Sequence, residues 1–151
     1  MNNLIKLLEE NAELYKNFLE LEYKKYDTVI RNDIETLDDI VTKEQAFYLK
    51  MRGLEQKREK LIDSMGMKGK TLKEIIDSAD SEKNILIEEY DKLNSIISEV
   101  KKVSNMCKTL LEVRLHRIDK AMSQLGEKEN IYTNNEVKNN NAKSIILSKK
   151  I

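Results

Sequence analysis

Few side chains in this chain have the types and spacing that catalysis requires. His116 is the only histidine and Cys107 the only cysteine, and nine positions separate them. On a helix that separation is about 13–14 Å along the axis, which is too far for a cysteine–histidine dyad. Metal sites and catalytic triads need several converging groups, and a single imidazole between Arg114 and Arg117 does not supply them.

The carboxylates offer no better acid–base site. Pairs such as Asp38 with Asp39 and Glu88 with Glu89 are adjacent in sequence, so on a helix they diverge by about 100°. No glycine-rich phosphate loop, His-Glu-x-x-His or Cys-x-x-Cys motif occurs in the sequence. We therefore predict no enzyme activity, no catalytic residue, no metal site and no cofactor. Cys107 is expected to be a small buried apolar side chain.

The composition favours long helices. Charged residues make up 36% of the 151 residues and apolar ones 40%, with no Pro, no Trp and four Gly. Lys plus Arg equals Asp plus Glu at 27 each, but the second part of the chain, residues 101–151, is net basic. No aromatic side chains interleave these basic positions, which argues against nucleic-acid binding and favours a basic face that is either solvated or matched to an acidic protein. No stretch approaches about 20 apolar residues, and no signal peptide is evident, so we expect a cytoplasmic protein without membrane insertion.

Apolar periodicity and capping signals predict four helices. A first helix covers residues 3–31, and Asn32 followed by Glu35 is the expected N-cap of a second helix over 33–65, although a continuous helix is an alternative. Gly66 and Gly69 stop the second helix because glycine accepts the left-handed conformation of a C-cap. The sequence predicts an all-α fold, an elongated antiparallel helical bundle or coiled coil of three long helices plus one short helix.

The short helix and the last long helix have their own end signals. Thr71 to Glu74 has the spacing of a capping box, and it opens a helix of one or two turns that crosses the end of the bundle. Asp80 and Ser81 are expected to cap the long helix, which Gly126 closes. Residues 1–126 then form the helical domain, and residues 127–151 form an Asn-rich flexible tail. Whether Ile145, Ile146 and Leu147 in that tail dock somewhere is left open.

The long helix has more apolar surface than one neighbour requires. One stripe alternates steps of three and four: Leu86, Tyr90, Leu93, Ile97, Val100, Ser104, Cys107, Leu111, Arg114, Ile118, Ala121 and Leu125. A second stripe lies beside it: Ile85, Ile96, Val103, Leu110, Leu115 and Met122. The first half of the helix is expected to form the core with the two earlier helices. The second half, which also carries most of the excess positive charge, is where we expect a partner.

Three sequence features resemble the FlgN-type flagellar secretion chaperones. Asn32-Asp33, Leu37, Ile40 and Glu44, followed by Leu54-Glu55, Arg58 and Leu61, look like the second-helix pattern of that family. Thr71-Leu72 with Ile75-Ile76 looks like its short capped segment, and Asn105 ahead of Leu110-Leu111 resembles the start of its C-terminal binding stretch. The similarity covers most of residues 4–132.

The resemblance implies a function. Such chaperones hold amphipathic terminal segments of hook–filament junction proteins before export, and the matching client-binding positions here are Leu110, Leu111, Arg114, Leu115, Ile118, Met122 and Leu125. The family pattern also has a Tyr followed by Gly that is implicated in docking at the flagellar export gate. Tyr132 is the matching position, although Thr133 stands where the pattern has Gly. The expected partners are the C-terminal segments of junction proteins and the export gate.

Two alternatives remain open from the sequence. The wide apolar arc is also typical of a structural coiled-coil module that buries it against a copy of itself. That module is an obligate oligomer, whereas a client-binding chaperone is a monomer or a weak homodimer. A chaperone for a different flagellar client, such as a filament-cap protein or flagellin, has the same sequence signature.

Overall fold

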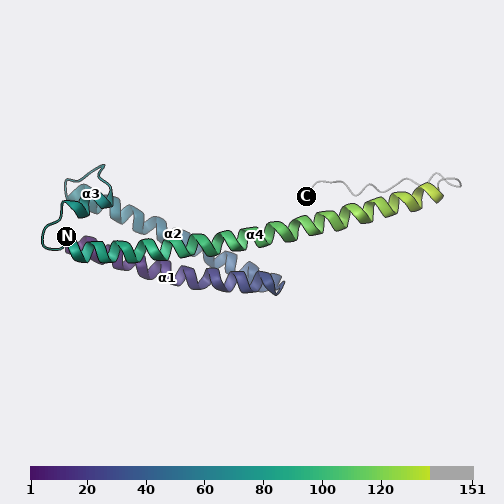
Figure 1. The fold of residues 1–151 in the computed structure, drawn as a ribbon, viewed down its shortest axis with the longest axis horizontal. Coiled ribbons are helices and arrows are strands. Elements are labelled where there is room, and N and C mark those ends of the chain that lie inside the picture. Colours follow the sequence, from purple (N-terminus) through teal and green to yellow (C-terminus); the bar gives the residue numbers. More distant parts are fainter. Residues whose placement is uncertain (137–151) are drawn as a thin grey trace. The chain divides into compact units, whose positions relative to one another are not determined.

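The computed structural model describes residues 1–136, with the side chains of residues 1–128. Within that range lie α1 (Asn2–Ile30), α2 (Ile34–Ser64), α3 (Leu72–Asp77) and α4 (Lys83–Glu136), and no strand (Figure 1). The predicted all-α bundle of three long helices and one short helix is confirmed. No described helix has the length and apolar character needed to cross a bilayer.

The break between α1 and α2 is real, but its cap differs from the prediction. Asn32 does not cap α2, because its φ of 56° places it in the left-handed turn between the two helices. Asp33 is the N-cap, and its Oδ1 accepts a hydrogen bond of 3.0 Å from the backbone N–H of Thr36. Asn tolerates a left-handed backbone better than most residues, so the turn uses Asn32 for its conformation and Asp33 for its carboxylate.

The turns after α2 follow the prediction. Gly66 and Gly69 have φ angles of 70° and 81°, the left-handed region that glycine enters without steric cost. Thr71 forms a complete capping box with Glu74: the Thr71 hydroxyl accepts from the Glu74 backbone N–H, and the Glu74 carboxylate accepts from the Thr71 backbone N–H at 2.7 Å. These groups fix where α3 begins.

Both predicted ends of the long helix are wrong. The helix begins at Lys83, and its first turn is closed by the Leu86 N–H donating to the Glu82 carbonyl at 3.0 Å, so neither Asp80 nor Ser81 is the cap. At the other end, α4 continues through Gly126 to Glu136. Gly126 has no positive φ, and an interior glycine costs only about 1 kcal/mol relative to Ala, so the helix passes through it. Residues 137–151, including Ile145 to Leu147, lie outside the described residues.

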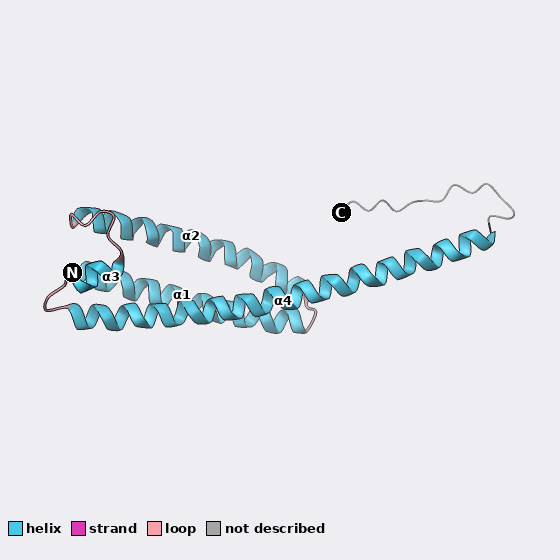
Figure 2. Ribbon diagram, turned by 45° about the horizontal axis from the view of Figure 1, so that its top comes forward, coloured by secondary structure: helices cyan, strands magenta, loops and turns pink. Residues whose placement is uncertain are grey.

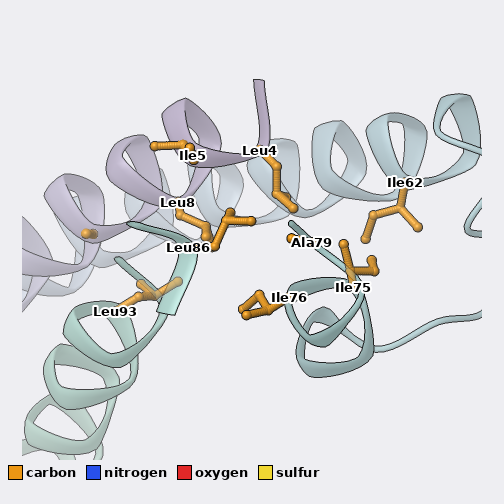
Figure 3. Close-up of a cluster of buried hydrophobic side chains, with 10 residues drawn as sticks. Leu4, Ile5, Leu8, Ile62, Ile75, Ile76, Ala79, Leu86 and Leu93 are labelled. Atoms are coloured by element: carbon orange, nitrogen blue, oxygen red, sulfur yellow. The ribbon is translucent and has the colours of Figure 1, made fainter. Parts of the chain in front are cut away.

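The chain divides into two compact units, residues 1–110 and the residues from Leu111 onward. In the first unit, a core forms where the start of α1, the end of α2, α3 and the start of α4 meet (Figure 3). Its members are Leu4, Ile5, Leu8, Ala12, Ile62, Ile75, Ile76, Ala79, Leu86 and Leu93. Each large side chain buried in this way stabilises the fold by about 1.5–3 kcal/mol. The short helix thus contributes Ile75 and Ile76 to the core at this end of the first unit.

Further along the first unit, α1 packs against α2 and against the beginning of α4 (Figure 2). The Phe18 ring of α1 lies 5.4 Å from that of Phe47 and 5.6 Å from that of Tyr48, both on α2. Tilted aromatic pairs at this distance add about 0.5–1.5 kcal/mol beyond the area that they bury. The first unit therefore has apolar contacts between α1 and α2 in addition to its core cluster. The predicted division into a helical domain, residues 1–126, and a tail, residues 127–151, stays a prediction.

Candidate functional site

The burial of α4 ends at Cys107. Leu86, Val100 and Cys107 of the first apolar stripe and Val103 of the second are all buried in the first unit. Of residues 108–128, whose side chains the structure also describes, none is buried. The prediction that Cys107 is a small buried side chain is confirmed, and it marks the last turn of α4 that the core of the first unit covers.

Beyond that point α4 keeps an apolar face. Leu111, Leu115, Ile118, Met122 and Leu125 follow one another in steps of four and three, which places all five on one side of the helix. We call these five residues the apolar face. Leu111 is half-buried, whereas Leu115, Ile118, Met122 and Leu125 are 61%, 55%, 65% and 62% exposed. Four consecutive large side chains of one face are therefore more accessible to solvent than covered.

Not every predicted site residue belongs to this face. Leu110 lies about 100° around the helix from Leu111, and it belongs to the first unit. Arg114 is half-buried and lies at the edge of the apolar face, where its charge borders the apolar side chains. Tyr132 is on α4, but its side chain lies outside the part that the structure describes. The structure thus groups five of the predicted client-binding residues, sets Arg114 at their border and separates Leu110.

A buried polar cluster joins three helices just before the apolar face. The Ser104 hydroxyl of α4 donates to Oε2 of Glu22 on α1 at 2.8 Å, and the Cys107 thiol lies 3.8 Å from the Glu22 carbonyl oxygen. Nζ of Lys25, also on α1, lies 2.7 Å from Oε1 of Glu44 on α2. Glu22 and Glu44 are only 1% and 5% exposed. We call these five residues the polar cluster; they tie α4 to the α1–α2 hairpin.

This environment raises the pKa of the Glu22 carboxyl. Burial, together with a hydrogen bond to the carboxyl of Glu44, raises the pKa of Glu22 to about 7. Among the described groups, the buried Oε1 of Glu22 has no hydrogen-bond partner, which also disfavours the ionised carboxylate. Burial opposes the charge on Lys25, but the two carboxylates outweigh it and raise the pKa of Lys25. Burial also raises the pKa of the Cys107 thiol.

Sequence reasoning missed the polar cluster. Glu44 was named only as part of the second-helix pattern of the family, and no role was predicted for Glu22 or Lys25. A signal was present, because Glu22 lies four residues after the buried Phe18 on the same face of α1, and Ser104 interrupts the apolar stripe of α4. Two polar residues at positions that periodicity assigns to a core are expected to face each other. Only the packing of α1 on α4 shows that they do.

A surface hollow of about 680 Å³ lies beside the connection from α2 to α3, between Arg58, Asp63, Lys68, Thr71 and Tyr90. Of the cations that line it, Arg58 pairs with Glu55, and Nζ of Lys68 lies 3.5 Å from Oδ2 of Asp63. Within the described residues, no group of His, Cys, Asp and Glu side chains has the arrangement of a metal site.

Comparison with known proteins identifies the family of this chain. A family model described as FlgN protein matches residues 1–139. The chain belongs to the FlgN family. FlgN proteins are flagellar export chaperones, which bind flagellar export substrates. No curated protein and no solved structure matches the chain.

The FlgN match includes every element discussed above. Residues 1–139 contain the polar cluster, the apolar face and Tyr132. The resemblance noted from Asn32-Asp33, the capped segment at Thr71 and the stretch after Asn105 is therefore confirmed at the level of the family.

Proposed function

We propose that this FlgN-family chain binds the amphipathic C-terminal segments of hook–filament junction proteins in the cytoplasm, prevents their premature assembly and delivers them to the flagellar export gate. The observation that supports this most directly is the apolar face of α4. Its four large side chains from Leu115 to Leu125 are more than half exposed. A surface of this kind on a family of export chaperones is best explained by a protein that covers it.

The binding mode that fits one uncovered helical face is a client helix laid along it. An amphipathic segment that is disordered before assembly gains its helical structure when its apolar side meets the apolar face. Burying five side chains of the size of Leu, Ile and Met contributes on the order of 10 kcal/mol gross, from which the ordering of the client subtracts several kcal/mol. Micromolar to nanomolar affinity follows from the remainder.

The test is a double substitution on the apolar face. In Leu115→Asp with Ile118→Asp, two carboxylates replace exposed apolar side chains that the core of the first unit does not need. We expect affinity for a purified junction protein to fall by about 100-fold or more, because each charge must be desolvated in the complex. Isothermal titration calorimetry with the intact client, and with a client that lacks its C-terminal segment, measures this loss and shows whether that segment is what binds.

A matched control carries the same two new charges on the opposite side. Val113 and Gln124 lie about 140–160° from Leu111 around the helix, so Val113→Asp with Gln124→Asp is expected to leave client affinity unchanged. Circular dichroism verifies that both variants fold. If the face variant folds and binds clients as tightly as the native chain, the apolar face is not the client site.

Delivery to the export gate is proposed to use Tyr132. The support is its position on α4 within the family match, after the apolar face. A Tyr132→Ala variant is expected to bind clients normally but to export them poorly, as measured by the amount of junction protein secreted by cells. Normal secretion by this variant would remove Tyr132 from the mechanism.

A further inference from the structure

The charged residues beside the apolar face are sorted by sign. Taking Leu111 as the reference direction, helical geometry places Arg114, Arg117 and Lys128 about 60–120° to one side. Glu112 and Asp119 lie about 80–100° to the other side. We call these the basic flank and the acidic flank. Arg114 is half-buried, and the other four side chains are exposed.

The other charged residues between Lys108 and Lys128 do not border the apolar face. Lys120 and Glu127 lie about 160–180° from Leu111, on the back of the helix. Lys108, which falls on the side of the acidic flank, precedes the apolar face and belongs to the first unit. From Leu111 to Lys128, all the charges that border the apolar face are therefore basic on one edge and acidic on the other.

We propose that these flanks select both the chemistry and the direction of the bound helix. The partner is an amphipathic helix with acidic residues along one edge of its apolar side and basic residues along the other. It lies on α4 in the one orientation that sets its acidic edge against the basic flank and its basic edge against the acidic flank. This inference rests on the proposed function, since it concerns the helix that the apolar face binds.

Helix-pair geometry makes the direction testable. Each helix has a left and a right edge beside its apolar side. When two helices pack in parallel, the left edge of one lies against the right edge of the other, whereas in antiparallel packing left meets left and right meets right. A helix whose charges are arranged like those of α4 therefore meets opposite charges in parallel packing and like charges in antiparallel packing. Exchanging the two flanks of α4 reverses this preference without altering the apolar side chains.

The experiment uses a synthetic peptide and the full chain. The peptide repeats the apolar steps of the apolar face, with Lys at the positions of Arg114 and Arg117 and Glu at those of Glu112 and Asp119. A Trp is placed at its N-terminus or its C-terminus, and the chain itself contains no Trp. The chain carries Cys107→Ser and a nitroxide label at Ala121→Cys, an exposed position beside the C-terminal half of the apolar face. The label quenches a Trp only when that end of the peptide is close.

The native flanks are expected to favour the parallel arrangement by about tenfold, so the C-terminal Trp is quenched and the N-terminal one is not. The flank-exchanged chain carries Arg114→Glu, Arg117→Glu, Glu112→Arg and Asp119→Arg, which leaves its net charge unchanged. In that chain the N-terminal Trp is expected to be quenched instead. Added salt should weaken both preferences, because the flanks are largely exposed.

Several outcomes overturn the inference. If the peptide binds and the same end is quenched in both chains, the flanks do not set direction, but the client site stands. A peptide whose flanks are all Gln is the control, and it should lose the preference while it still binds; if it keeps the native preference, the charges are not responsible. Suppose that the peptide does not bind the native chain and that the variant Leu115→Asp with Ile118→Asp still binds clients normally. These two results together would overturn both this inference and the proposed client site.

Discussion

Burying the carboxyl of Glu22 makes the stability of the first unit depend on pH. Its pKa is about 7 in the folded chain, because of burial and the neighbouring Glu44 carboxyl, and lies near its ordinary value of 4.5 in the unfolded chain. The folded state therefore binds more protons between these two values. The stabilisation is complete below about pH 4.5 and is lost as the pH rises through about 7.

The prediction concerns Glu22→Gln, which keeps an acceptor for the Ser104 hydroxyl and removes the charge. At pH 8 we expect the variant to be more stable than the native chain by on the order of 2–3 kcal/mol, with the difference shrinking toward pH 5. Urea unfolding of both chains from pH 5 to pH 8 measures it. Glu20→Gln changes an exposed residue two positions earlier and should leave the pH profile unaltered. A constant difference between the native chain and the Glu22→Gln variant across this range would contradict the assignment.

At the scale of the element, Gly126 is an interior residue of α4. The structure continues the helix through this residue, and a Cβ added there has no other atom within 4 Å. Gly126→Ala is therefore expected to stabilise the surrounding turns by about 0.5–1 kcal/mol, since Ala is the better helix former. Amide hydrogen exchange of residues 120–130 should slow by about two- to fivefold.

Gly66 provides the matched control for that substitution. It also has no atom within 4 Å of an added Cβ, but its φ is 70°, so Gly66→Ala is expected to destabilise the chain by about 1 kcal/mol. The two alanine variants thus differ in backbone conformation and not in available space. Faster exchange around residue 126 in Gly126→Ala would indicate that Gly126 is a left-handed cap after all.

At the scale of the whole molecule, the first unit does not need a second copy in order to fold. Leu4, Leu8, Ile75 and Leu86 are at most 1% exposed within one chain, so the core is complete. We therefore expect a monomer, or a weak dimer that dissociates on dilution, rather than an obligate coiled-coil oligomer. Sedimentation velocity over a wide concentration range measures this. A dimer that persists at the lowest concentrations and dissociates in Leu115→Asp with Ile118→Asp would favour the oligomerisation module.

The fold class and most helix positions could be predicted from the amino-acid sequence, because they depend on local patterns. Apolar periodicity placed the helices, the capping box at Thr71 fixed the start of α3, and the left-handed backbone of Gly66 follows the C-cap of α2 at Met65. Helical spacing also predicted that the second half of the long helix is apolar over a wide arc, with Leu111, Ile118 and Leu125 on one stripe and Leu115 and Met122 on the stripe beside it.

Tertiary packing was needed to tell which apolar positions are covered and which polar ones are buried. Periodicity treats Leu86 and Leu125 alike, yet the first is buried and the second is 62% exposed, because helix packing covers α4 only as far as Cys107. Glu22 and Ser104 looked like interruptions of apolar stripes until the packing of α1 on α4 brought them within 2.8 Å. Burial depends on residues distant in sequence, and no local pattern encodes which helix covers which turn.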